Sequence, residues 1–250
     1  MNDYIISTSI IIDALSKKGA IVDAIPDTNA YRIKLEKRIY YFIDGITPLI
    51  PYSVGILFSN EDEVREVFEN HFSLKFSANR NVIHKIFITK NGFFQVLKKV
   101  APKLIGNGKL TLDELIAREN LQRINNGNIL LYPLNIDKVS EALGISGDLV
   151  IEKNENVGEA ISKVLDDKSV YQDVTKTISP EIKKQTIKML KLFPHLGYLS
   201  IDGLIKTNTV EIASIQIDLG MHMFFPLHKN TVIKKAAEII ADLILEEKYE

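Results

Sequence analysis

The chain has 250 residues, of which 46% are apolar and 25% charged, and its net charge is -1. These values are typical of a globular protein with a large core, and the lack of a basic excess argues against a nucleic-acid or membrane-surface binder. The absence of cysteine excludes disulfides, thiolate metal sites and a catalytic thiol. With neither a recognisable signal peptide nor an apolar stretch of membrane-spanning length, we expect a cytoplasmic protein.

The first part of the sequence predicts a helix, a strand, a hairpin and a second helix. Apolar residues with helical spacing precede Gly19, and glycine is typical of the position just after a helix. Alternating apolar residues over 31–43 predict a hairpin that turns at Glu36. Pro48 and Pro51 both disfavour a helix, so we expect the segment around them to be extended or irregular. An acidic segment with helical spacing follows them.

The middle of the sequence contains two turn signals. Asn91–Gly92, between two apolar stretches, predicts a β-hairpin. A Gly-Asn-Gly turn at 106–108 is followed by Thr111 and Glu114, whose spacing predicts a capping box at the start of a helix. Residues 125–168 indicate short helices and turns.

The last third predicts a helix, two strands and a final helix. Pro180 follows Ser179 and fits the first turn of an amphipathic helix. Two strand-like segments come next, and the final helix is expected to start near Asn230. Together the elements predict an α+β protein built on antiparallel hairpins.

Local motifs leave several functions open. The five histidines lack a metal-binding spacing, so we expect structural or surface roles for them. The 106–108 turn lacks a following Lys-Ser or Lys-Thr pair, which favours a plain turn over a phosphate-binding loop. Asp202 and Glu211 lie on neighbouring predicted strands, where two carboxylates could hold Mg²⁺. The alternative is that one lies at a strand end and the other is exposed.

The segment VAPKLIGNGKLTLDELIAREN, residues 100–120, resembles the ATP-grasp ligases, in particular the branch with cyanophycin synthetase and the bifunctional glutathione synthetases. The matching positions are Gly106, Gly108, Lys109, Thr111 and Glu114. Further similar segments follow the family's order along nearly the whole chain, among them QDVTKTISPEIKKQTIKMLKLF, YLSIDGL and MHMFFPLHKN. The resemblance implies a truncated ATP-grasp fold, mostly antiparallel sheet with flanking helices. Residues 1–76 would form the pre-ATP-grasp and linker region and residues 77–250 the large lobe.

The sequence also departs from the family pattern. The lobe that binds the nucleotide, expected before the strand HKIFIT, is missing. Glu61 stands where the family has a lysine, and Glu152 where it has an arginine. Lys85 and Lys99 replace strand arginines and so lose the bidentate fork. Ala213 occupies the place of a metal-binding asparagine.

The resemblance assigns no catalytic residue to this chain. It implies substrate- or phosphate-site ancestry for Lys85, Lys99, Asn154 and Asn156. It leaves Asp202 and Glu211 as remnants of a metal site. No cofactor is expected for the isolated chain, although the family uses ATP and Mg²⁺, because these losses remove most of the groups that neutralise a triphosphate.

The expected function is that of a degenerate ATP-grasp protein, a non-catalytic partner or substrate-binding subunit of an ATP-dependent carboxylate–amine ligase, with an amino acid or peptide as ligand. One alternative is an active ligase completed by a partner chain, and another is a small-molecule sensor. We expect a homo-oligomer or a complex with an ATP-grasp homologue, and no nucleic acid or membrane. The candidate interface residues are Met221, Met223, Phe224 and Phe225, which could instead be core.

Overall fold

The computed structural model describes residues 3–28, 30–43, 47–72, 76, 84–102, 104–125, 134–164, 170–217 and 231–246. The chain divides into two compact units, with boundaries at residues 98/99 and 172/173. The first unit contains both chain ends as far as they are described, and the second is formed within residues 99–172. The expected boundary at 76/77 was based on the ATP-grasp resemblance and not on compactness. It stays a prediction.

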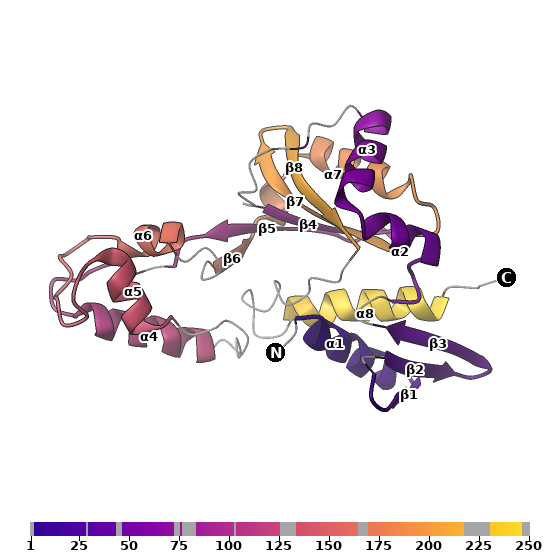
Figure 1. Ribbon diagram of the computed structural model, residues 1–250, viewed down its shortest axis with the longest axis horizontal. Helices are drawn as coiled ribbons and strands as arrows, with labels where there is room; N and C mark the ends of the chain where they lie inside the picture. The colour runs from indigo at the N-terminus through magenta and orange to yellow at the C-terminus, as the bar shows by residue number, and fades with distance from the viewer. Residues whose placement is uncertain are drawn as a thin grey trace. The chain divides into compact units, whose positions relative to one another are not determined.

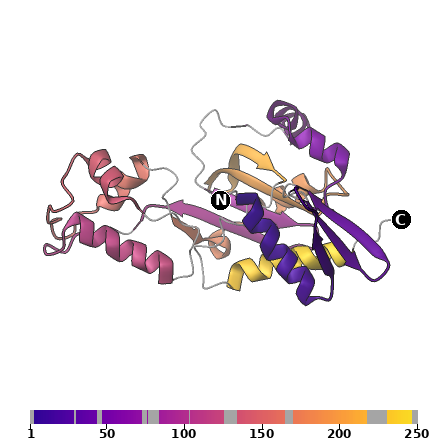
Figure 2. The same ribbon diagram turned by 60° about the horizontal axis from the view of Figure 1, so that its bottom comes forward.

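The N-terminal part of the first unit is a helix on a small sheet. Its elements are α1 (Asp3–Lys17), β1 (Ile21–Ala24), β2 (Ala30–Leu35) and β3 (Arg38–Ile43). The strands pair antiparallel in the order β1-β2-β3. Ile33 and Phe42 are fully buried on one face, while Ile39 and Tyr41 on the other are at least half exposed. Figure 2 shows α1 beside this sheet and α8 (Thr231–Glu246) beside α1.

The turns in this part follow the sequence signals, with one exception. Gly19 has a φ of 90° just after α1, and Glu36 has a φ of 52° between β2 and β3, as predicted for a C-terminal glycine and a hairpin. The segment around the two prolines was expected to be extended, and this is wrong for its second half. Helix α2 (Tyr52–Phe58) begins directly after Pro51, because proline at a helix start loses no hydrogen bond.

A five-stranded sheet has the strand order β6-β5-β4-β7-β8, and β4, β7 and β8 lie wholly in the first unit. The strands are β4 (His84–Thr89), β5 (Phe94–Val100), β6 (Val170–Asp173), β7 (Tyr198–Lys206) and β8 (Thr209–Gln216). Gly92, with a φ of 90°, turns the chain between β4 and β5 and confirms the predicted hairpin. β7 and β8 confirm the two strands predicted near the C-terminus.

The two faces of this sheet differ in chemistry. One face is apolar, with Ile86 and Ile201 fully buried, and the helix α7 (Pro180–Leu190) contacts β4 and β8. Lys183 of α7 lies 5.6 Å from the centre of the Phe94 ring on that face. Figure 1 shows α7 and α3 (Glu61–Phe72) on this side of the sheet and α8 on the other. Three aromatic rings, from Phe58, Phe68 and Phe193, hold α2 and α3 to the segment after α7.

The second unit is built from α4 (Leu112–Asn125), α5 (Ile136–Leu143) and α6 (Val157–Val164). Its own core includes Leu104, Ile116, Val139 and Ile161. The capping box is confirmed, since Thr111 Oγ1 accepts the Glu114 amide at 3.2 Å and Glu114 Oε2 accepts the Thr111 amide at 2.9 Å. The short helices expected between 125 and 168 are α5 and α6.

The final helix α8 starts at Thr231, next to the expected Asn230, and buries Ala237, Ile240 and Ile244. The candidate interface residues Met221, Met223, Phe224 and Phe225 lie outside the described residues. None of the helices in the described part of the chain has the length and apolar composition needed to cross a bilayer.

The stability of the first unit should depend on the protonation of His84. Its Nδ1 accepts the Ile205 amide at 3.2 Å, and burial, with the nearby charge of Lys98, lowers the pKa of His84 below 6.5. Because the unfolded chain then binds the proton more tightly, stability is fully present above about pH 6.5 and is lost as pH falls toward the folded-state pKa. Thermal unfolding between pH 7.5 and 5 should show this loss.

His84→Asn replaces the Nδ1 acceptor with an amide oxygen and removes the titration, so its melting temperature should fall less steeply over the same pH range. His195→Asn, at an exposed position, should retain the wild-type slope. A wild-type slope in His84→Asn would contradict the assignment.

Candidate functional site

A row of polar side chains crosses the sheet face that is turned away from α7. We call it the polar stripe, and it consists of Lys85, Ser200, Asp202 and Ser214. Lys85 lies directly opposite Asp202 in the β4–β7 pair, and Asp202 lies opposite Ser214 in the β7–β8 pair. Because side chains alternate along a strand, Ser200 shares the face with Asp202.

An ion pair forms the centre of the polar stripe. Lys85 Nζ lies 3.6 Å from Asp202 Oδ1, and the two side chains are only 7% and 13% exposed. At about 4 Å and an effective dielectric constant of ~20, two unit charges attract by about 4 kcal/mol. Removing both ions from water offsets much of this attraction, but removing one partner leaves a buried charge uncompensated. The two residues therefore depend on each other.

Two hydroxyl groups complete the stripe. Ser214 Oγ donates to Asp202 Oδ2 at 3.4 Å. Ser200 is 1% exposed, and its hydroxyl has no hydrogen-bond partner among the residues that the structure describes. A buried hydroxyl usually finds a partner, and Ser200 is an exception within the described residues. The sequence signal for these residues is the alternation of polar and apolar residues along β7.

The two carboxylates considered as a possible Mg²⁺ pair do not lie directly opposite each other. Asp202 and Glu211 do lie on adjacent strands, but the register places Glu211 opposite Leu204 and shifts between Asp202 and Gly203. Ala213 is the additional residue in β8 at this shift, as in a β-bulge. Glu211 is engaged by Lys206 from β7. Lys206 thus neutralises Glu211, whereas Lys85 neutralises Asp202.

At the β6 side of the sheet, the Asp-Val-Thr segment performs a structural role. Asp173 Oδ2 accepts the Gln95 side chain at 3.0 Å, and Asp173 Oδ1 accepts the Thr175 amide at 2.9 Å. Thr175 Oγ1 accepts the Val96 amide at 2.9 Å, and the Val174 amide reaches the Val96 carbonyl at 3.0 Å. These bonds satisfy the backbone at the β5 edge.

In the second unit, the Gly-Asn-Gly turn packs against the loop that carries the two predicted asparagines. The Gly106 amide donates to the Glu155 carbonyl at 2.8 Å, and the Asn154 amide donates to the Gly106 carbonyl at 2.9 Å. Asn107 Oδ1 accepts the amides of Lys109 and Leu110, each at 2.9 Å. Amides that a phosphate would need are used within the protein, as expected for a plain turn.

The two asparagines contribute to this loop through their local conformation. Asn154 has a φ of 68°, in the left-handed region that asparagine tolerates best after glycine. Asn156 Oδ1 accepts the Gly158 amide at 3.1 Å and so caps α6. Both side chains are exposed.

The predicted site residues are divided between the two units. Lys85, Asp202 and Glu211 belong to the first unit, and the structure brings only Lys85 and Asp202 together. Lys99, Asn154 and Asn156 belong to the second unit, where Lys99 is half-buried at the end of β5. Glu61 begins α3 and lies 3.6 Å from Arg65 of the same helix.

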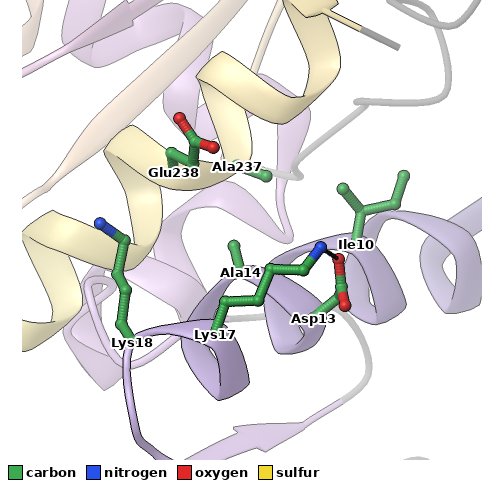
Figure 3. A pocket seen from close by; sticks show the side chains of 7 residues that line it. All are labelled: Ile10, Asp13, Ala14, Lys17, Lys18, Ala237 and Glu238. Carbon is green, nitrogen blue, oxygen red and sulfur yellow. Dashed lines mark hydrogen bonds and ion pairs between the residues drawn. The ribbon is translucent and has the colours of Figure 1, made fainter.

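A surface pocket of about 240 Å³ lies between α1 and α8. None of the predicted site residues lines it. Figure 3 shows its lining: Ile10, Asp13, Ala14, Lys17, Lys18, Ala237 and Glu238. Lys17 pairs with Asp13 of the same helix, and Lys18 reaches Asp242 of α8 at 2.6 Å. The pocket is smaller than typical ligand sites of about 300–1,000 Å³. Of the charged side chains that line the pocket, Lys18 links α1 to α8, whereas Lys17 and Asp13 pair within α1.

The polar stripe does not fit the Mg²⁺ that the ATP-grasp resemblance implies. Within the described ranges, no three His, Asp or Glu side chains gather in a way that could hold a metal ion. Asp202 already faces an ammonium group, Glu211 pairs elsewhere, and Ala213 offers no side-chain oxygen. Mg²⁺ needs oxygen ligands at about 2.1 Å in a near-ideal octahedron, and a lysine beside the carboxylate repels it.

Comparisons with known proteins find a similar fold. No protein-family model and no curated protein matches the sequence. Among solved structures, the chain resembles a bifunctional glutathione synthetase from Pasteurella multocida, with a TM-score of 0.67 and 12% sequence identity. The match covers 96% of this chain and 43% of the synthetase chain. The chain has an ATP-grasp-like fold.

This similarity confirms the predicted fold class, mixed helices and antiparallel sheet in an ATP-grasp-like arrangement. The chain spans less than half of the synthetase's length. At 12% identity the likeness concerns the fold alone, so the activity and substrates named in that protein's description do not transfer with it.

Replacing Gly106 should destabilise the second unit. A Cβ at Gly106 would lie 2.1 Å from the Glu152 carbonyl oxygen and 2.8 Å from that of Ile151, both rigid backbone atoms. Gly106→Ala should therefore cost at least about 2 kcal/mol, as other severe overpacking does. Limited proteolysis and thermal unfolding measure the loss.

Gly55→Ala is the matched control. Gly55 lies inside α2, and a Cβ there meets no atom within 4 Å, so alanine should leave the protein equally stable or more so. Equal stability of Gly106→Ala and wild type would show that the two loops do not pack as described.

Proposed function

We propose that the chain is a degenerate ATP-grasp protein of the cyanophycin synthetase and bifunctional glutathione synthetase type, acting as a non-catalytic partner or substrate-binding subunit of an ATP-dependent carboxylate–amine ligase. The observation that carries this proposal is the buried Lys85–Asp202 pair within an ATP-grasp-like fold. Phosphoryl transfer depends on cations that neutralise the transferred phosphate. Here a carboxylate of the sheet is neutralised by the protein itself.

The spacing of α3 and β4 supports the same conclusion. Only residues 73–83 connect the end of α3 to the start of β4. The family resemblance places a nucleotide-binding lobe at this point of the chain, and so short a segment cannot form one. Glu61 at the start of α3 adds negative charge where a triphosphate would need a cation.

Exposed apolar side chains, which share the outer sheet face with Lys34 and the Asp23–Arg32 ion pair, support association with another chain. Ile21, Ile39, Tyr41 and Ile43 project from the outer face of the three-stranded sheet and are each at least half exposed. β3 is an edge strand among the described strands, and edges of this kind readily pair with another strand. Antiparallel pairing of β3 with its own copy about Tyr41 sets Ile39 opposite Ile43. The face is therefore self-complementary, and a second copy is its occupant in this proposal.

The isolated chain should bind Mg·ATP no more tightly than about 100 μM, an ordinary substrate-level affinity. Calorimetry on the full chain measures this, with a complete bifunctional glutathione synthetase as the positive control. Tighter binding, or ADP release by the chain alone in the presence of amino acids, would overturn the non-catalytic role. ADP release only after addition of a homologous ligase chain would favour the alternative of a site completed by a partner.

Ile39→Lys should abolish self-association while leaving the melting temperature nearly unchanged, because the side chain is 54% exposed. Light scattering and thermal unfolding test the two parts. Leu121→Lys, a similar change at an exposed position of α4 in the second unit, should leave association unaffected. A monomeric wild type would end the proposed pairing of β3.

A further inference from the structure

The Lys85–Asp202 pair supplies a cation from inside the protein. The two residues lie directly opposite each other in the β4–β7 register and on one sheet face. Both side chains are nine-tenths or nearly nine-tenths buried, and Nζ is 3.6 Å from Oδ1. A carboxylate in such a place requires a counter-charge, and the ammonium group provides it at a fixed position.

Two further groups of the described residues lie near Asp202. Its second oxygen accepts the Ser214 hydroxyl at 3.4 Å. The one acidic side chain on the paired strand near it, Glu211, is held by Lys206. A hydrated divalent ion can bind through a single carboxylate and waters, so the ligand count alone does not close the position. The Lys85 ammonium excludes a divalent ion, because it already lies beside the Asp202 carboxylate and repels a second cation.

Lysine suits this role better than arginine would. Its ammonium is a compact point charge on a flexible stem with three donors, whereas guanidinium is a planar fork that favours bidentate partners. Lys85 can therefore direct its charge at one carboxylate oxygen. It leaves the Ser200 hydroxyl, buried on the same face, without a partner in the described structure.

We propose that the Lys85 ammonium is the permanent cation of the polar stripe and takes the electrostatic place that a divalent cation holds beside a carboxylate in the ligases. Asp202 is consequently closed to divalent ions, and the polar stripe works without a metal cofactor. This inference rests on the ATP-grasp ancestry in the proposed function, but it does not depend on the partner or the substrate.

Mn²⁺ is the probe for the test. Its paramagnetism broadens amide signals close to a bound ion, and its free concentration is read directly by electron paramagnetic resonance. In the wild type, Mn²⁺ should leave the amides of Ile201, Asp202 and Gly203 unbroadened beyond the effect seen over the whole surface. Selective broadening at these three residues in the wild type would overturn the proposal.

Removing the Lys85 ammonium should make the Asp202 carboxylate accessible to a divalent ion. Lys85→Ala should bind Mn²⁺ at least about 10-fold more tightly than the wild type, with broadening centred on Asp202, and adding Asp202→Asn should remove this gain. Lys176→Ala removes a lysine from an exposed position of the segment Thr175–Thr177 and should match the wild type. A folded Lys85→Ala variant without increased Mn²⁺ affinity would overturn the proposal.

If Lys85→Ala does not fold, Lys85→Gln keeps most of the side-chain volume and takes its place. If neither variant folds, the broadening pattern of the wild type decides by itself. The result is independent of the nucleotide experiment: a chain that binds Mg·ATP but shows no Mn²⁺ at Asp202 would refute the non-catalytic role and leave the role of Lys85 intact.

Discussion

The buried ion pair between Lys85 and Asp202 sets the electrostatic character of one face of the central sheet. A buried sheet face normally carries apolar side chains, and here two opposite charges and two hydroxyls lie beside the buried Phe87, Leu97 and Tyr198 on one face. Each charge is tolerated because the other lies across the strand pair. Neither residue can change alone without leaving a buried ion, and together they make the face polar yet electrically neutral.

In the second unit, packing accounts for the Gly-Asn-Gly turn. The Gly-Asn-Gly turn and the asparagine loop are joined by backbone hydrogen bonds, and Gly106 allows an approach that any side chain would block. The capping box then starts α4 at a defined residue. These contacts use the amides internally. Packing is therefore a sufficient reason for the turn, whether or not a ligand once bound there.

The similarity to a bifunctional glutathione synthetase and the departures at individual residues agree with each other. The fold match covers nearly all of this chain but less than half of the synthetase, and the connection between α3 and β4 is short. The likeness is one of backbone arrangement, which tolerates changes at most positions. The chemistry of a ligase depends on a few side chains, which a likeness of backbone arrangement does not specify.

The sequence by itself determined the local structure, because capping, turn and periodicity signals act over a few residues. The hairpins at Glu36 and Gly92, the capping box at Thr111 and the start of α7 at Pro180 were all readable in this way, and so was the order of segments that indicates an ATP-grasp-like fold. The helix after Pro51 was missed because proline both ends and begins helices. Only the tertiary structure decided that Lys85 meets Asp202 while Glu211 meets Lys206, because strand register, with its shift at Gly203, sets which side chains lie opposite. Lys85 and Asp202 lie more than a hundred positions apart in the sequence, and no local pattern encodes their pairing.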